Sequence, residues 1–519
     1  MTKKPNFLIF MVDQCNGTFF GGPRPEAPKG GPADFLHMPH LKALYAKGVN
    51  FANNYCASPL CAPSRAAFMS SLLPSRTGVY DNAAEFASSV PTFAHHLRQA
   101  GYLTALSGKM HFVGPDQLHG FERRTTTDVY PADFGWTPDW TKPDERIDWW
   151  YHNLGSVTTA GVAETTNQLE YDDEVAFYAN QTLHQFSRLD RSQPFCLTVS
   201  FTHPHDPFVT RQKYWDLYPE DKMPALRTAT IPYEDHDPHS KRLLDMSDWR
   251  NFDTTHQKVI DSRRAYFGNL SYIDEKIGQV MDTLRACNFA DDTIVMFVSD
   301  HGDMLGEKGL WFKMSFFEGS ARVPLMVCAP DAMKDRFEPA TVTQPTSTLD
   351  VFPTLVELAG IEVPTDIDGV SLKPALDGQG EDRNVIVEYA AEGSIAPMVM
   401  VREGRYKLTV CPADPDQLFD LEADPEELTN LAGDPVHSEA YEALKARVES
   451  AYDFDAYTQD VLTSQKHRLL VYDALRNGNY YPWDYQPLQQ ASERYMRNHK
   501  DLNVLEGDAR YPRFTENKT

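Results

Sequence analysis

The most reactive feature of the 519-residue chain is a cysteine at the start of a short helical pattern. Pro63 suits the first turn of a helix, where its missing N–H costs nothing, so Cys61 lies at a predicted helix N-terminus. Backbone N–H groups and the positive end of the helix dipole converge there, and Arg65 adds a fixed charge with bidentate donors. Taken alone, one cysteine among seven is more often a small buried side chain. In this setting it predicts a nucleophile beside a site for a tetrahedral oxyanion.

The run Cys-Ala-Pro-Ser-Arg at residues 61–65 fits the Cys-x-Pro-Ser-Arg signature of type I sulfatases, and the chain resembles that family. The resemblance implies that Cys61 is oxidised after translation to formylglycine, whose hydrated aldehyde is the nucleophile. One hydroxyl of the hydrate would attack sulfur and expel the alcohol. The second, once deprotonated, would collapse the sulfated hemiacetal to the aldehyde and release sulfate. A sulfate ester of a plain serine or cysteine has no second hydroxyl and cannot release sulfate in this way, which explains the modification.

Two apolar runs that predict strands buried on both faces end in pairs of polar residues. The runs are residues 7–12 and 293–299, and the pairs that follow them are Asp13-Gln14 and Asp300-His301. An acidic residue after one strand is by itself more often a helix cap or part of a turn. Because ligands gather at the carboxyl ends of strands in open α/β sheets, two such pairs predict one site for a hard cation.

The sulfatase resemblance implies one divalent cation per subunit. The implied ligands are Asp13, Gln14, Asp300, His301 and the formylglycine oxygen at Cys61. Many sulfatases have Asp-Asp at the first pair and Asp-Asn at the second, so Gln14 and His301 are departures. A neutral amide and an imidazole lower the negative charge around the ion, which moves the expectation from Ca²⁺ toward Mn²⁺ and leaves Ca²⁺ and Mg²⁺ open.

Basic side chains follow other predicted strands in the order that sulfatases have. They include a Gly-Lys-x-His element at residues 108–111 and the loop at residues 202–207. The resemblance implies that Lys109 and Lys313 bind sulfate oxygens and that His111 assists collapse of the hemiacetal. It also implies that His203 contacts sulfate and protonates the leaving alcohol. The predicted catalytic residues are Cys61, Arg65, Lys109, His111, His203 and Lys313.

Alternating strand and helix patterns predict the elements that position these residues. Apolar runs at 6–12, 102–107, 195–201, 293–299 and 323–329 alternate with helical patterns. This alternation predicts an α/β fold with a mostly parallel sheet between helices, as in the alkaline-phosphatase-like fold of sulfatases. Short strands after residue 380 predict a smaller C-terminal α+β domain with an antiparallel sheet. We therefore expect a catalytic domain at 1–380, a small domain at 381–460 and a C-terminal tail at 461–519.

Composition limits the partners and the compartment. The formal charge of −25 argues against a protein that binds nucleic acid or an anionic membrane. The N-terminus lacks the cleavage site of a signal peptide, and no apolar stretch is long enough to span a membrane. The seven cysteines show neither disulfide-framework nor zinc-ligand spacing, which favours the reducing cytoplasm.

Aromatic residues suggest the substrate. Four of the eight tryptophans lie in residues 136–150 among aspartates, a composition that suits either a quaternary ammonium cage or a hydrophobic lid. We take Trp136 and Trp149 as the first candidates for the cage, although spacing does not rank them above Trp140 or Trp150. The aromatic tail from Tyr480 onward carries too many anchoring side chains for a disordered end, so we expect it to wrap a neighbouring surface.

These stretches resemble the choline sulfatases within the sulfatase family over nearly the whole chain. That resemblance implies hydrolysis of choline-O-sulfate in the cytoplasm, which feeds glycine betaine synthesis, after activation by a formylglycine-generating enzyme. It also implies a homodimer or homotetramer in which the tail reaches a neighbour's active site, with Asp501 as an acidic partner of the ammonium. The alternatives are a phosphonate monoester or phosphodiester hydrolase, a broad aryl or alkyl sulfatase, and a binding protein with an unmodified cysteine.

Overall fold

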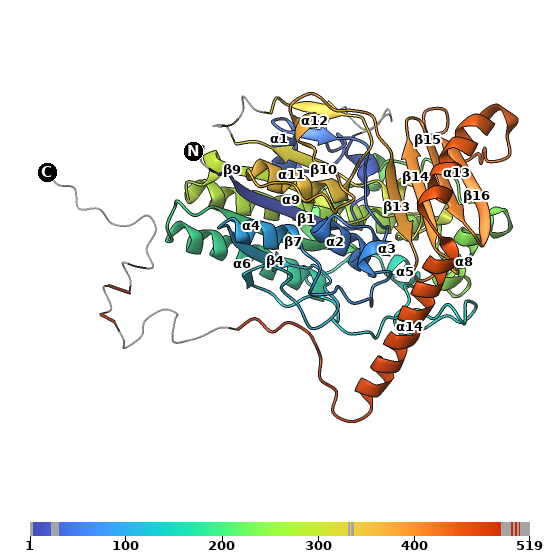
Figure 1. Ribbon diagram of the computed structural model, residues 1–519, viewed down its shortest axis with the longest axis horizontal. Helices are drawn as coiled ribbons and strands as arrows, with labels where there is room; N and C mark the ends of the chain where they lie inside the picture. The colour runs from blue at the N-terminus through green and yellow to red at the C-terminus, as the bar shows by residue number, and fades with distance from the viewer. Residues whose placement is uncertain are drawn as a thin grey trace.

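The computed structural model describes residues 4–21, 31–330, 333, 337–488, 500–501, 504–505 and 508. Its centre is an eight-stranded sheet with the order β11-β2-β10-β9-β1-β7-β4-β5 (Figure 1). The strands are β1 (Asn6–Asp13), β2 (Val49–Phe51), β4 (Leu103–Gly108), β5 (Arg123–Arg124), β7 (Phe195–Pro204), β9 (Thr293–Ser299), β10 (Leu325–Cys328) and β11 (Ala340–Val342). Strand β10 runs antiparallel to both neighbours, and the other pairs are parallel. The predicted α/β fold class is confirmed.

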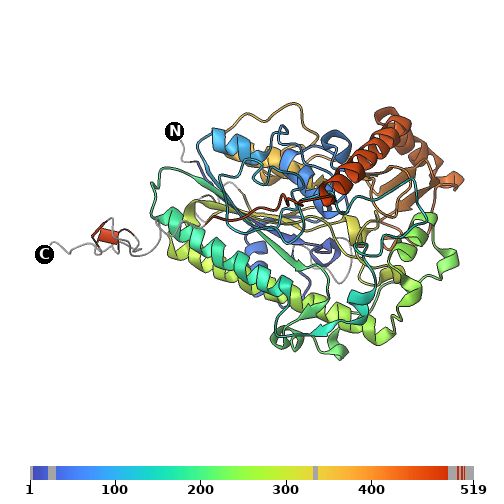
Figure 2. The ribbon, with the colours of Figure 1, turned by 90° about the horizontal axis from the view of Figure 1, so that it is seen from below.

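Helices cover both faces of this sheet because β1 is apolar at every position and sends alternate side chains to two cores. Leu8, Phe10 and Val12 pack on the face covered by α1 (Pro39–Tyr45), α6 (Asn167–Ser187) and α9 (His256–Ala286). Phe7, Ile9 and Met11 pack on the face covered by α2 (Cys61–Ser70), α4 (Phe93–Gln99) and α11 (Val351–Leu358). The long helices α6 and α9 lie side by side along one face (Figure 2). The central strands are therefore fixed from both sides.

A second, antiparallel sheet lies beside the first and is drawn in orange in Figure 1. Its strands, in spatial order, are β13 (Val385–Tyr389), β14 (Met398–Glu403), β15 (Tyr406–Cys411) and β16 (Asp414–Asp420). The inward side chains of β14 and β15 pack against Leu444 and Val448 of α13 (Ser438–Ala451). The chain then forms α14 (Phe454–Arg476). The smaller antiparallel sheet is confirmed, and the exact division at residues 380 and 460 stays a prediction.

Short elements join these parts. They are β3 (Asn54–Tyr55), β6 (Gly161–Val162), β8 (Val209–Thr210), β12 (Thr346–Ser347), α3 (Pro74–Thr77), α5 (Gly155–Thr158), α7 (Gln212–Trp215), α8 (Pro238–Met246), α10 (Glu318–Ala321) and α12 (Lys373–Leu376). In the part of the chain that the structure describes, none of the helices has both the length and the apolar character that a membrane span requires.

The register of the central strands brings distant residues to one edge of the sheet. Val12 pairs with Ser299, so Asp13 and Asp300 leave neighbouring strands at the same level. On the other side of β1, β7 continues as far as Pro204, and Gly108 at the end of β4 pairs with Ser200. The carboxyl ends of β1, β4, β7 and β9 therefore form the rim of a single site, where open α/β sheets bind ligands.

Gly108 offers a test of this close packing at the rim. Its φ of +114° lies in the left-handed region, and an added Cβ would collide with the backbone carbonyl of Ser200. We expect Gly108→Ala to lower the free energy of unfolding by about 2–5 kcal/mol, through backbone strain and overpacking together. Gly101→Ala is the matched control, because Gly101 also has a positive φ but no atom within 4 Å of the added Cβ. Its expected cost is about 1–2 kcal/mol. Equal losses in urea unfolding would contradict the close approach of β4 and β7.

Candidate active site

Cys61 is the first residue of α2, and every residue of that helix is buried. The loop and the neighbouring strand fix this helix end. Ala62 N donates to Asn82 Oδ1 at 2.9 Å, and Ser64 Oγ donates to the carbonyl of Asp300 at 2.6 Å. The thiol lies 3.1 Å from His301 Nε2 and 3.9 Å from Asp13 Oδ1. The predicted nucleophile and the predicted metal ligands therefore meet.

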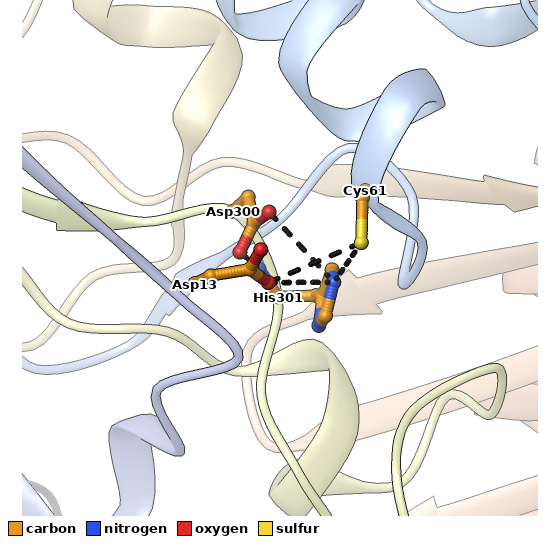
Figure 3. Close-up of side chains that lie close together, drawn as sticks. All are labelled: Asp13, Cys61, Asp300 and His301. Atoms are coloured by element: carbon orange, nitrogen blue, oxygen red, sulfur yellow. Dashed lines mark hydrogen bonds and ion pairs between the residues drawn. The ribbon is translucent and has the colours of Figure 1, made fainter. Parts of the chain in front are cut away.

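Four buried side chains form a group that could hold a metal ion: Asp13, Cys61, Asp300 and His301 (Figure 3). One ligand atom of each lies within 4.8 Å of the others. Two carboxylates and an imidazole are donors that suit Ca²⁺, Mg²⁺ or Mn²⁺, and the Cys61 side chain completes the group. The residues therefore fit the divalent cation that the sequence predicted.

Gln14, the fifth predicted ligand, directs its carboxamide elsewhere. Its Nε2 donates to Asp303 at 2.6 Å and to Asp206 at 3.3 Å, and its Oε1 accepts from Lys313 Nζ at 2.7 Å. The backbone of Gln14 has a φ of +65° and donates its N–H to Asp300 at 3.1 Å. In this arrangement Gln14 connects the metal side of the site to Lys313, and its amide oxygen is already occupied.

Two buried cations balance the carboxylates. Arg65 donates from Nε to Asp300 at 2.8 Å and lies 3.6 Å from Asp13, while Lys109 forms an ion pair with Asp13. Burial by itself would raise the pKa of Asp13, but neighbouring positive groups, Lys109 first among them, hold it well below its ordinary value. Arg65 also donates to Ser200 at 2.9 Å and to the carbonyl of Lys109 at 2.6 Å. It therefore ties α2 to the ends of β4 and β7.

His111 faces the site with an unused ring. The residue is 3% exposed, and neither ring nitrogen has a hydrogen-bond partner among the described residues. Burial lowers the pKa of His111, which favours the neutral imidazole. Its ring centroid lies 5.0 Å from that of Tyr130 and 5.8 Å from that of Trp136. Since buried polar atoms are nearly always paired, the two free nitrogens indicate where a ligand or water binds.

The structure places the predicted catalytic histidine, His203, within β7, where it bonds to a residue of α6. His203 Nδ1 lies 2.6 Å from Asp172, and its ring packs against Tyr272 under the helices α6 and α9. His205, two residues further on, lies 2.6 Å from Lys313 Nζ and 3.4 Å from the hydroxyl of Tyr130. His205, and not His203, therefore faces the predicted sulfate-binding lysine. The sequence contains both histidines on either side of Pro204, and spacing alone could not choose between them.

The pair formed by Lys313 and His205 has a defined charge state. Burial opposes the charge of Lys313, but negative groups, among them Cys61 and Asp206, outweigh it and raise the lysine pKa. Burial and the positive charge of Lys313 together lower the pKa of His205 well below its usual value. These shifts favour a charged Lys313 and a neutral His205. Lys313 can then donate a proton and His205 can accept one.

The aromatic candidates separate into two groups. Trp136 stacks against Trp150 with ring centroids 6.2 Å apart and planes within 11°, and Tyr130 adjoins Trp136 at 5.1 Å. Trp149, the other predicted cage residue, is 61% exposed. The structure thus brings Trp150 next to Trp136, where we had named Trp149. Asp501 is exposed.

Glu392 is an acidic residue near the site that the sequence analysis missed. It is 3% exposed, and its Oε2 has no hydrogen-bond partner in the described ranges. The pKa of Glu392 is raised to about 7, mainly by burial. The negative charge of Asp81 contributes to the rise, and the positive charge of Lys313 opposes it. It lines a cavity of about 360 Å³ together with Trp140 and Tyr151. No sequence signal marked it, because it lies in a loop after β13, far from every motif.

Comparison with known proteins places this fold and site in a family. The sulfatase family model matches residues 5–361, and the model described as choline sulfatase enzyme C terminal matches residues 459–511. A third model, N-sulphoglucosamine sulphohydrolase, C-terminal, matches residues 306–453. The chain belongs to the sulfatase family, which confirms the resemblance seen in the sequence.

Among the curated relatives, the choline-sulfatase of Rhizobium meliloti (strain 1021) is 60% identical over 521 residues, which span 99% of both chains. The arylsulfatase of Clostridium perfringens is 29% identical over 401 residues, covering 73% of this chain and 79% of that protein. The crystal structure of the phosphonate monoester hydrolase of Agrobacterium radiobacter has a TM-score of 0.68 and 22% identity, with 86% of this chain and 95% of that chain covered. The structural likeness establishes the fold alone.

The metal site can be tested by its stoichiometry. We expect Asp300→Asn to weaken binding of the divalent cation by about 10- to 100-fold, because it removes one of two anionic ligands. The measurement is elemental analysis of the purified protein together with Mn²⁺ titration. Asp303→Asn is the matched control. Asp303 lies in the same loop but accepts hydrogen bonds from the backbone of Leu305 and Phe312, and burial raises its pKa to about 7, so an uncharged side chain suits the position. Metal content that is unchanged in Asp300→Asn would contradict the site.

Proposed function

We propose that the chain hydrolyses choline-O-sulfate to choline and sulfate, with a formylglycine made from Cys61 as the nucleophile. The observation that carries this proposal is the 60% identity, over 99% of both chains, with a choline-sulfatase. The match of residues 459–511 to the choline sulfatase C-terminal model supports it, since this segment lies outside the general sulfatase match. The geometry around Cys61 gives the catalytic steps.

Basic groups on the rim bind the sulfate and balance its charge. Lys109, Lys313 and Arg65 are fully buried, so their charges act in a site from which water is largely excluded. We assign Lys109 and Lys313 to the sulfate oxygens. We assign Arg65 to holding Asp13 and Asp300 in place, because its guanidinium is already bonded to Asp300, Ser200 and a carbonyl.

We assign proton transfer to His111 and to the Lys313–His205 pair. One hydroxyl of the formylglycine hydrate attacks sulfur and passes its proton to neutral His205, while the S–O bond to the choline oxygen breaks. Lys313, the charged member of the pair, supplies a proton to that oxygen, and transfer of the proton from His205 to Lys313 restores the pair. His111, neutral and unpaired, then removes the proton of the second hydroxyl, so the C–O bond to sulfate breaks and the aldehyde returns.

A divalent cation would be held by Asp13, Asp300, His301 and the residue at position 61. When bound, it would lower the pKa of the hydrate hydroxyl and neutralise charge on the sulfate. Mn²⁺ is the ion we favour because one ligand is an imidazole, with Ca²⁺ next and Mg²⁺ third. Gln14 can bind the cation only if its Oε1 gives up the hydrogen bond from Lys313 Nζ. On that condition we keep it as a proposed metal ligand.

Recognition of the quaternary ammonium requires aromatic faces and a negative charge, because this group cannot donate hydrogen bonds. Trp136, stacked on Trp150, supplies the aromatic surface. Glu392 supplies a buried carboxylate without a partner on Oε2, whose pKa near 7 would fall when a cation binds beside it. Asp501 remains our proposal for a further acidic group that a neighbouring subunit contributes, and Trp149 stays a candidate at the entrance.

The wider setting follows from the same proposal. A formylglycine-generating enzyme must modify Cys61 before the chain is active. We propose a cytoplasmic homodimer or homotetramer assembled through the tail, with catalytic residues in 1–380, an accessory sheet in 381–460 and the tail in 461–519. None of the seven cysteines forms a disulfide and all are buried, which suits a reducing compartment.

The substrate class is tested by steady-state rates on three esters with one protein sample of known formylglycine content. We expect kcat/KM to be highest for choline-O-sulfate, although p-nitrophenyl sulfate has the more reactive leaving group. We expect kcat/KM to be lowest for the phenyl phosphonate monoester. Cys61→Ala should abolish all three activities. Preference for the phosphonate would instead support a phosphonate monoester hydrolase, and residual turnover by Cys61→Ala would exclude the formylglycine route.

The ammonium site is tested with Glu392→Gln, which keeps the shape of the side chain and removes its charge. We expect KM for choline-O-sulfate to rise by about 10- to 100-fold, since pairing a desolvated charge is worth a few kcal/mol. The rate on p-nitrophenyl sulfate, which has no cation, serves as the internal control and should change by less than about threefold. Trp136→Ala should show the same split. A similar loss on both esters would mean that Glu392 supports packing and not recognition.

A further inference from the structure

A segment after α14 packs along the catalytic domain. We call residues Tyr480–Tyr485 the strap; the extended chain that follows α14 contains it (Figures 1 and 2). Four of its side chains contact one loop. Tyr480 bonds to Asp133, Trp483 packs edge-on against Phe134 with centroids 5.0 Å apart, Asp484 accepts from Ala132 N at 3.0 Å, and Tyr485 donates to the carbonyl of Arg124 at 3.2 Å. The strap thus holds residues 124–134.

The held loop carries a buried carboxylate beneath the catalytic backbone. Asp128 Oδ2 accepts hydrogen bonds from the backbone N–H of Met110 at 3.0 Å and of His111 at 2.9 Å. The same oxygen receives the guanidinium of Arg124, whose other nitrogen is bonded to Gln117. The Arg124 guanidinium in turn lies over the ring of Tyr485, 5.5 Å from its centroid. A continuous set of contacts therefore runs from the strap to the backbone of His111.

His111 needs this support because its backbone is in an unfavourable conformation. Its φ of +54° lies in the left-handed region, which costs energy for a residue with a Cβ. Two charge-assisted bonds from the neighbouring N–H groups to Asp128 fix that conformation. Without them, the ring of His111 would not be held toward Cys61.

The same loop also positions Lys109. Tyr130, two residues after Asp128, places its ring beside Lys109 Nζ, 4.2 Å from the centroid, and its hydroxyl 3.4 Å from His205. The side chain of Asp128 is bonded to the backbone of Tyr130, since Asp128 Oδ1 accepts from Tyr130 N at 3.4 Å. A shift of this loop would therefore displace Lys109 and His111 together.

We propose that the strap acts within its own subunit as a positioning element for the catalytic loop, and that Arg124 and Asp128 are the positioning residues that transmit its effect to His111 and Lys109. This inference rests on the proposed sulfate ester hydrolysis at Cys61 and goes beyond it. Neither residue touches the reacting atoms. Their function concerns the rate of the chemical step for any sulfate ester, whereas the ammonium site concerns choline esters alone.

The first experiment compares Tyr485→Ala with Tyr481→Ala in full-length, metal-loaded protein of measured formylglycine content. Tyr481 belongs to the strap but is 75% exposed, so it is the matched control. We expect Tyr485→Ala to lower kcat by about tenfold or more on both choline-O-sulfate and p-nitrophenyl sulfate, with KM changed by less than about threefold, because misplaced catalytic groups affect the chemical step. Tyr481→Ala should keep the wild-type kcat. Tyr485→Phe, which retains the ring over Arg124, should restore most of the rate.

Outcomes other than this overturn the inference in identifiable ways. Equal kcat values for the two alanine variants would show that the strap does not position the loop. A loss confined to choline-O-sulfate would assign Tyr485 to substrate recognition. Asp128→Asn provides a second route if Tyr485→Ala folds poorly. It should lower kcat on both esters while thermal unfolding and metal content stay near wild type, and a kcat within about twofold of wild type would remove Asp128 from the pathway. If the wild-type protein hydrolyses neither ester, the proposed function is wrong, and the strap proposal, which rests on it, falls with it.

A subunit-mixing experiment separates action within one subunit from action between subunits. Tyr485→Ala subunits, which keep Cys61, are co-expressed with Cys61→Ala subunits, which keep an intact strap. If the strap acts within its own subunit, the mixed protein retains the low kcat per formylglycine of Tyr485→Ala. Recovery of wild-type turnover per formylglycine would show that a neighbour's strap serves the site, and this would overturn the proposal.

Discussion

The compensation of two buried carboxylates by two buried cations is the interaction on which the rest of the site depends. Asp13 and Asp300 leave neighbouring strands and are fully enclosed, a position that costs several kcal/mol per ion unless the charge is paired. Arg65 pairs with both, and Lys109 pairs with Asp13. Because Arg65 lies one turn after Cys61 on α2, the same ion pairs that neutralise Asp13 and Asp300 also fix Cys61 beside them. The parallel pairing of β1 with β9 sets the separation of the two carboxylates. The register of the sheet therefore determines how strongly these charges interact.

The two halves of the chain contribute different side chains around Cys61. The central sheet and the segments that follow its strands provide the buried basic and acidic groups. The C-terminal part provides Glu392 and α14, whose Arg468 forms a buried bidentate pair with Asp81, both distances being 2.7 Å. Gln465 of the same helix accepts from Trp140 N at 2.9 Å. The tryptophan-rich insertion is therefore anchored to the C-terminal helix, which gives a physical reason why the choline-specific family model covers this end of the chain.

Charge distribution also explains how the site can hold a neutral base beside strong cations. Burial first, and then the positive charges of Lys109 and Lys313, lowers the pKa of His111 and of His205. Both shifts favour the neutral imidazole. Gln14 extends this balance, since its amide accepts from Lys313 and donates to Asp206 and Asp303. A second aspartate at this position would add a negative charge where the structure uses a neutral connector.

The sequence by itself determined the family, the fold class and the central strands, because these depend on short motifs and on the regular periods of strands and helices. It located Asp13, Cys61, Asp300 and His301 correctly in one group, since residues that follow parallel strands share an edge. Only the tertiary structure decided which way side chains point where the regular period ends. It placed His205 beside Lys313 and His203 beside Asp172, turned Gln14 toward Lys313, stacked Trp150 on Trp136, and brought Glu392 within electrostatic range of Lys313. These choices depend on long-range packing, for which local sequence carries no signal.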